Sequence, residues 1–308
     1  MKKPVVLLFG SLGMALALQL TSCHRHTRAE DLYQRAEEAF VAGQYHTAQS
    51  IIDSIPLCDS LAFEWIRKSI VLNQRITLEQ NRHNLASIDS LLPTLYARRD
   101  TLLPQFIYHK VDNQTSDGYY TYRLDRNAGK ADHSCLRVQI TDDFEAEIIS
   151  VYCGKRPLNH VSAKAELPDG TYALTPTTPY DGALNYRFTF QNGNHCELVR
   201  YIGHELRSVF EIIVASPQQP IKISYEGEFP YSYTLSDNDR KAIEQCFKFI
   251  SLQRHIDRLE QEKEIARKTI ELLQRQLAPN PEQQASHKTS TDSSTAKNFA
   301  QPLPRIAK

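Results

Sequence analysis

The spacing of apolar residues changes twice along the chain and divides it into three regions. Between residues 29 and 104 apolar positions recur every three or four residues, as on one face of a helix. Between residues 105 and 235 they alternate with polar positions, as in half-buried strands. Residues 236–278 return to the helical spacing. The pattern predicts an α+β fold in which helical regions precede and follow an antiparallel β domain.

The first helical region opens with two short segments of helical pattern, over residues 29–55, separated by Gly43. The hairpin is similar to a single tetratricopeptide unit in four residues, Ala36, Gly43, Tyr45 and Ala48. Pro56 comes several residues early for that family, and no second copy follows. Because such solenoids need about three repeats to bury a continuous core, a plain helical hairpin is the preferred interpretation.

Residues 61–92 hold no glycine or proline and predict one long helix. At 1.5 Å per residue, its roughly thirty residues would extend about 48 Å. Pro93 is expected to end or kink this helix, and Pro104 to close the helical region.

The alternating region, residues 105–235, predicts about eight to ten antiparallel strands in a sandwich or an open barrel. The alternation is clearest over residues 120–124, 136–140, 186–190 and 221–225. Asn192-Gly193 is the strongest hairpin signal, because both positions of a tight turn favour positive φ. Further turn signals are Asp117-Gly118, Pro168-Asp169-Gly170 and Asp181-Gly182. Long helical crossovers have no room between these runs.

A long helix is predicted over residues 236–278, with N-cap residues at positions 236–239. Its heptad-spaced apolar seam consists of Phe249, Leu252, Ile256, Leu259, Ala266, Ile270, Leu273 and Leu277. The seam predicts a coiled-coil contact. Its partner is either the helix of residues 61–92 in the same chain, which we prefer, or a second copy in a parallel dimer. Residues 279–308 are polar and predict a disordered tail.

The N-terminus has the pattern of an export signal. Lys2 and Lys3 precede an uncharged run that ends near Leu20, shorter than the ~20 residues that a permanent membrane helix needs. We therefore predict a signal peptide over residues 1–22; the alternative is an N-terminal membrane anchor.

Leu20-Thr21-Ser22-Cys23 resembles the lipobox of bacterial lipoproteins. The resemblance implies cleavage between Ser22 and Cys23, acylation of Cys23, and a tether over residues 23–28. It also implies that the lipid bilayer is a partner, in the cell envelope of a Gram-negative bacterium. With His24 rather than aspartate after the cysteine, the expected location is the outer membrane, facing the periplasm.

Net charge and cysteine spacing exclude one class of partner and two classes of site. The 36 basic and 36 acidic residues cancel, so nucleic acid is not an expected partner. The six cysteines contain no Cys-x-x-Cys, which argues against a zinc ribbon or a thioredoxin-like centre. Acylation of Cys23 leaves five thiols, which we interpret mainly as small buried residues. The alternative is one disulfide among Cys135, Cys153 and Cys196.

Candidate chemistry is weak, and no motif of a nucleophilic enzyme is present in the sequence. The best metal-ligand cluster is His195, Cys196, His204 and Glu205, and a second is His24 with His26; neither has convincing spacing, and no metal or cofactor is predicted. The acidic residues Asp142, Asp143, Glu145 and Glu147 are interpreted as a solvated strand end or turn. The tyrosines, among them Tyr119, Tyr120, Tyr122, Tyr225, Tyr231 and Tyr233, are interpreted as core and rim rather than as a ligand-binding face.

These observations predict a non-enzymatic, lipid-anchored envelope protein that presents its β domain on a helical stalk to another envelope component. The first alternative is a lipoprotein whose β domain binds a small hydrophobic ligand or a glycan. The second alternative is a hydrolase without a recognisable motif.

Overall fold

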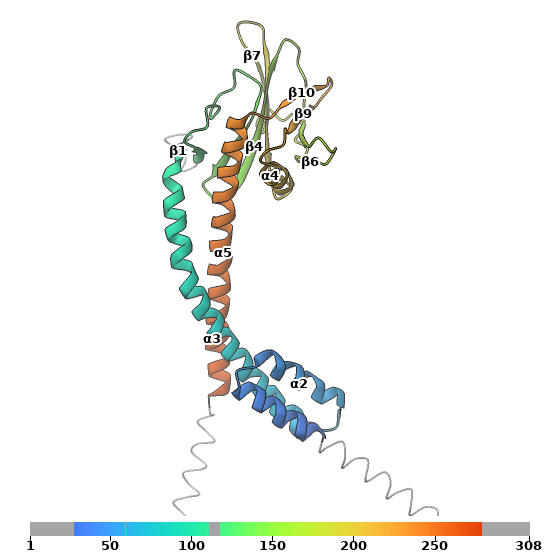
Figure 1. Ribbon diagram of the computed structural model, residues 1–308, viewed down its shortest axis with the longest axis vertical. Coiled ribbons are helices and arrows are strands. Elements are labelled where there is room, and N and C mark those ends of the chain that lie inside the picture. Colours follow the sequence, from blue (N-terminus) through green and yellow to red (C-terminus); the bar gives the residue numbers. More distant parts are fainter. Residues whose placement is uncertain (1–27, 59, 111–117, 279–308) are drawn as a thin grey trace, which may run out of the picture. The chain divides into compact units, whose positions relative to one another are not determined.

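The structure is a computed structural model that describes residues 28–58, 60–110 and 118–278 (Figure 1). The chain divides into two compact units, Met1–Asp89 with Glu262–Lys308, and Ser90–Gln261. We name them the helical unit and the β unit. The leader, Cys23, His24, His26 and the tail at 279–308 lie outside the described residues, so what the sequence predicts for them stays a prediction.

The helical unit begins with two short helices, over residues 28–41 and in α2, Tyr45–Cys58. They pack with the first part of α3, Phe63–Leu102, through a cluster of buried residues: Ala36, Ala39, Ala48, Ile52, Leu72 and Ile76. Five of the six are alanine or β-branched, so the helices can pack with little loss of side-chain entropy. The predicted helical hairpin is confirmed.

Gly43 produces the reversal between these two helices. Its φ is 74°, a left-handed conformation that glycine adopts without steric cost. Its N–H donates to the carbonyl of Phe40 at 3.0 Å, and the N–H of Gln44 donates to the carbonyl of Ala39 at 2.9 Å. These two bonds close the first helix and let α2 begin two residues later.

Pro93 does not end the long helix, because α3 continues to Leu102; the alternative, a kink at this residue, stays a prediction. A proline inside a helix removes one backbone hydrogen bond. Leu92 and Leu95 are buried on either side of it, and their burial holds the following turns in place. Pro104 does close the helical region, within the short 3-10 helix Leu103–Gln105.

The second long helix, α5, spans Asp237–Leu277. Its first turn is capped by Ser236, whose Oγ accepts a hydrogen bond from the N–H of Asp239 at 3.1 Å. Six of the eight seam residues are buried within the single chain: Phe249, Leu252, Ile256, Leu259, Ala266 and Leu273. Because these side chains are buried in a single chain, other parts of the same chain cover α5 along the seam.

Two contacts join α3 and α5 inside the helical unit. Gln74 donates to the side chain of Gln276 at 3.1 Å, and Lys263 forms an ion pair with Asp89 at 2.5 Å. The later residue of α3 meets the earlier residue of α5, so the helices run antiparallel there. The contacts agree with the preferred pairing within one chain, while coiled-coil packing of the whole seam stays a prediction.

The β unit contains two antiparallel sheets. The first has the order β1 (Phe106–Lys110), β2 (Gly118–Tyr122), β3 (Cys135–Thr141), β4 (Ala146–Gly154), β8 (His195–Ile202) and β7 (Asn185–Thr189). The second has the order β10 (Tyr231–Thr234), β9 (Lys222–Glu226), β5 (Ser162–Glu166) and β6 (Tyr172–Leu174). The predicted antiparallel β domain is confirmed at this level.

The core of the β unit includes residues of both sheets and of two helices (Figure 1). One of these helices, α4 at Leu206–Ala215, corrects the expectation of strands alone between residues 105 and 235. Its buried residues, Leu206, Val209, Phe210 and Ile213, have the helical spacing of three and four. The helix is only ten residues long, so its pattern is hard to separate from a buried strand.

The hairpin at Asn192-Gly193 is present, between β7 and β8. The N–H of Phe190 donates to the carbonyl of Asn194 at 2.9 Å, which leaves three residues in the loop. Gly193 has a φ of 76°, whereas Asn192 is not among the described non-glycine residues with positive φ. The expected two-residue turn is therefore wrong; this is the three-residue hairpin with glycine in the left-handed position.

Candidate functional site: a buried serine, histidine and glutamate

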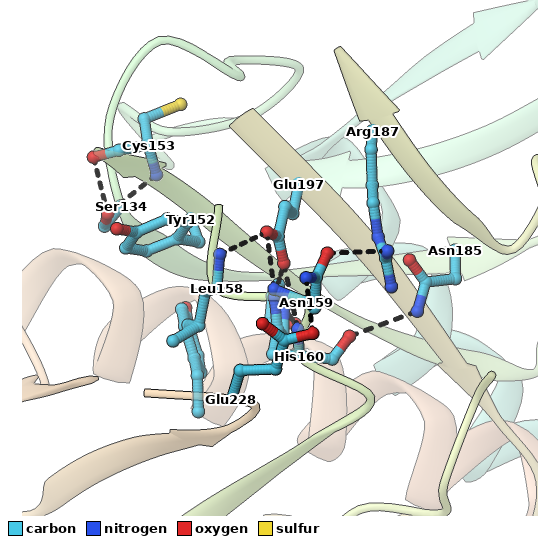
Figure 2. A network of polar contacts seen from close by, with 12 residues as sticks. Ser134, Tyr152, Cys153, Leu158, Asn159, His160, Asn185, Arg187, Glu197 and Glu228 are labelled. Carbon is cyan, nitrogen blue, oxygen red and sulfur yellow. Dashed lines mark hydrogen bonds and ion pairs between the residues drawn. The ribbon is translucent and has the colours of Figure 1, made fainter. Parts of the chain in front are cut away.

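The carboxylate of Glu197, on β8, lies inside the β unit and binds a segment of backbone (Figure 2). Its Oε1 accepts the N–H groups of Leu158 at 2.6 Å and Asn159 at 2.7 Å. Its Oε2 accepts the N–H of His160 at 2.9 Å. Three consecutive backbone donors thus surround one buried anion, in a concave arrangement of the kind that binds anions.

The local backbone depends on Asn159, whose φ is 56°. Asparagine tolerates this left-handed conformation better than most residues. Its side chain is held on both sides (Figure 2): Nδ2 donates to Glu228 at 2.9 Å, and Oδ1 accepts from Arg187 at 2.7 Å. These contacts fix the turn that directs the three N–H groups toward Glu197.

The ring of His160 connects Glu197 to Ser150, on β4. Nδ1 lies 2.7 Å from Oε2 of Glu197, and Nε2 lies 2.7 Å from Oγ of Ser150. Oγ of Ser150 is also 2.9 Å from the hydroxyl of Tyr201. Since an ionised carboxylate only accepts, Nδ1 carries a proton; with a neutral ring, Ser150 donates to Nε2 and Tyr201 donates to Ser150. Serine, histidine and carboxylate in this order are the arrangement of nucleophilic hydrolases.

The hydrogen bonds determine the charge of Glu197. Burial by itself would raise its pKa, but the hydrogen bonds from the His160 ring and from the N–H groups of Asn159 and His160 outweigh burial and lower the pKa to about 2. Burial raises the pKa of Tyr201. At neutral pH the site therefore holds one carboxylate and a neutral phenol.

Solvent does not reach this trio. The exposed fraction is 0% for Ser150, 0% for His160 and 1% for Glu197. A catalytic serine must contact the carbonyl carbon of a substrate, whereas Ser150 is enclosed between His160 and Tyr201. The geometry therefore serves as an internal brace that ties β4 and β8 of one sheet to the segment leading into β5 of the other.

A second buried carboxylate, Glu147, corrects the interpretation of the acidic group. Asp142, Asp143 and Glu145 are exposed in the turn between β3 and β4, as expected. Glu147 is buried, and its Oε2 accepts from Arg200 at 2.6 Å and Gln139 at 2.5 Å. The alternation of β4 places Glu147 on a covered face, where the guanidinium neutralises it.

Two cysteines of the β unit form a disulfide, Cys153–Cys196. They are register partners on β4 and β8, a juxtaposition that sequence spacing does not reveal. The preferred interpretation of unpaired thiols is wrong for this pair, and the alternative that allowed one bridge is confirmed. Among the described residues, Cys58, Cys135 and Cys246 are unpaired.

The disulfide also removes Cys196 from the candidate metal cluster. His204 and Glu205 are exposed, with 3.6 Å between Nδ1 of the histidine and Oε2 of the glutamate. His195 is on β8, where it pairs in register with Gly154 of β4. Within the residues that the structure describes, no three His, Cys, Asp or Glu side chains are grouped to hold a metal ion.

The tyrosines of the second sheet belong to the packing, in agreement with the preferred interpretation. Tyr225 is buried, and its hydroxyl donates to the carbonyl of Cys135 at 2.6 Å. Its ring stacks on His160 with centroids 4.8 Å apart. Tyr233 contacts the Tyr225 hydroxyl at 3.1 Å.

The pattern of the sequence does not predict the site formed by Ser150, His160 and Glu197. One signal was available: Glu197 alternates with Val199 and Tyr201, so a carboxylate falls on the apolar face of its strand. A buried carboxylate needs donors, but the sequence does not identify His160, 37 residues away, as one of them.

Comparisons of this chain with protein-family models, curated proteins and solved structures found no match. In the described part of the chain, none of the helices combines the length and apolarity that crossing a membrane requires.

Proposed function

We propose that this protein is a lipid-anchored, non-enzymatic component of a bacterial cell envelope. Its mature chain begins at an acylated Cys23, and its β unit binds another envelope component. The observation that carries the proposal is the sequence Leu20-Thr21-Ser22-Cys23 after an uncharged run. Several acyl chains hold a protein at a bilayer persistently, whereas one chain binds only marginally.

Two features of the β unit support the proposal. The disulfide Cys153–Cys196 is of a kind that persists in oxidising compartments such as the periplasm. The hydrolase-like trio is enclosed by protein, so these three residues do not support the hydrolase alternative. In this proposal the two sheets form a sandwich. The two long helices pair along a coiled-coil seam and act as the stalk that presents the sandwich.

The anchor is tested by growing cells that express the full-length protein with a tagged fatty acid. We expect the tag on the wild-type chain and on Cys58→Ala, a matched cysteine control, but not on Cys23→Ala. The mass of the wild-type N-terminal peptide should show cleavage before Cys23 with acylation. Label retained by Cys23→Ala, or a leader still attached, would overturn the proposal.

A further inference from the structure

A pocket of about 230 Å³ opens in the β unit between α4, α5 and the start of β4. Its floor is apolar, formed by Leu206, Phe210, Phe247 and Ile250. The rings of Phe210 and Phe247 stack with centroids 5.6 Å apart and an interplanar angle of 21°. A floor of aromatic and aliphatic side chains is typical of a small-molecule site.

The ionisable side chains that line this pocket, all within the described chain, are basic or imidazole groups: His204, Arg207, Arg254, His255 and Arg258. No aspartate or glutamate of the described chain lines it. Apart from the histidines, Ser251 is the one uncharged polar side chain among the lining residues. A sugar needs several acceptors as well as donors, so this lining matches an anion joined to an apolar group.

Two of the arginines have acidic neighbours outside the pocket lining. Arg207 pairs with Glu211 at 2.7 Å, and Arg254 pairs with Glu145 at 2.6 Å. All four side chains are well exposed. Exposed ion pairs are weak, so both guanidinium groups can turn toward an anion in the pocket.

A second hollow, of about 290 Å³, lies against the first. The two share Phe247, Ser251 and His255. The second hollow adds the basic residues Arg98 and Lys248. The apolar surface beside α5 therefore extends past the first pocket, and basic side chains accompany it.

We propose that this pocket binds an amphiphile with one anionic head group on a straight hydrocarbon chain. The head lies at Arg207 and Arg254, and the chain lies on Phe210 and Phe247. An apolar cavity of about 150 Å³ binds benzene, so a pocket of about 230 Å³ has room for a chain somewhat longer than six carbons. This site is independent of the acylation of Cys23.

Titration calorimetry on residues 23–308 carrying Cys23→Ala tests the site without a competing acyl chain. We expect saturable one-to-one binding of octanoate and octyl phosphate, at least tenfold weaker binding of octyl glucoside, and none of octyltrimethylammonium. Tighter binding of octanoate would indicate a fatty acid, and tighter binding of octyl phosphate a lipid phosphate. Equal binding of the neutral or cationic detergent, or no saturable binding of either anion, would overturn the proposal.

Variants locate the site. Arg207→Gln with Arg254→Gln should weaken octanoate binding at least tenfold and leave octyl glucoside unchanged. Arg275→Gln is the matched control, because Arg275 forms a similar exposed i,i+4 pair, with Glu271. Ser251→Trp should fill the pocket and abolish binding, with Ser232→Trp as its control. Thermal melts establish that each variant folds; unchanged binding in the double arginine variant would refute the site.

Discussion

Glu197 accepts four hydrogen bonds inside the β unit. It is a full charge inside the protein, and such a charge is tolerated only when donors replace the lost water. Three backbone N–H groups and the His160 ring supply these donors. The carboxylate therefore contributes to stability through a depressed pKa, and that contribution depends on pH.

Glu197→Gln tests the brace. The amide keeps the volume but turns an NH₂ group toward groups that also donate, so we expect the free energy of unfolding at pH 7 to fall by about 3 kcal/mol. Urea denaturation followed by circular dichroism measures the change. Glu228→Gln, at an exposed contact of the same segment, should cost far less. Equal losses in the two variants would contradict the role assigned to Glu197.

The same carboxylate makes the free energy of unfolding depend on pH. Its pKa is about 2 in the folded protein against 4.5 for the unperturbed group, so the unfolded state binds the proton more readily. The stabilisation is complete above about pH 4.5 and is lost as pH falls toward 2. The stability difference between wild type and Glu197→Gln should narrow across that window.

At the scale of elements, the disulfide joins two strands that are adjacent in the sheet and distant in the chain. Cys153 and Cys196 are 43 residues apart, so the bond restricts the unfolded chain strongly. We expect Cys153→Ala with Cys196→Ala to lower the free energy of unfolding by up to about 4 kcal/mol, measured by urea denaturation.

Reductant provides the control for this prediction. It should destabilise wild type by the same amount and leave the double variant unchanged, while Cys58→Ala should behave as wild type. If reductant shifts the double variant as much as wild type, the stabilisation comes from somewhere other than this bond.

The sequence was sufficient for the elements that bury one face over many residues. The eight seam residues of α5 repeat often enough to specify a helical period. The alternation in β3 specifies a strand, but its half-buried interpretation is wrong, because Arg137 and Gln139 on the second face are buried too. The sequence was insufficient for α4, which offers only two or three turns. It was also insufficient for the Ser150 site, because that site requires β4 beside β8, and a pairing of distant strands leaves no local signal.

At the scale of the whole molecule, our proposal gives the helical unit the role of stalk and the β unit the role of recognition. The helical unit consists of helices packed through alanine, isoleucine and leucine side chains. The β unit carries the pocket and an exposed aromatic row on edge strand β7, in which Tyr186 and Phe188 stack at 5.7 Å. Our proposal places partner recognition on these surfaces of the β unit, although the helical unit also has exposed apolar side chains, among them Leu57 and Phe63.

Photo-crosslinking in intact cells tests this division. A crosslinking amino acid at Tyr186, which is 50% exposed, should capture an envelope partner. The same group at Val41 in the helical unit, 79% exposed, should not. Capture from Val41 alone would instead indicate assembly through the helical unit.

The bond between Cys153 and Cys196 has a practical consequence for limited proteolysis of this protein. The chain it encloses contains β5, β6 and β7. A protease that cleaves once between Gly154 and His195 separates no fragment, because both pieces stay covalently joined. Such a nicked molecule migrates as a single band in a denaturing gel until a thiol is added.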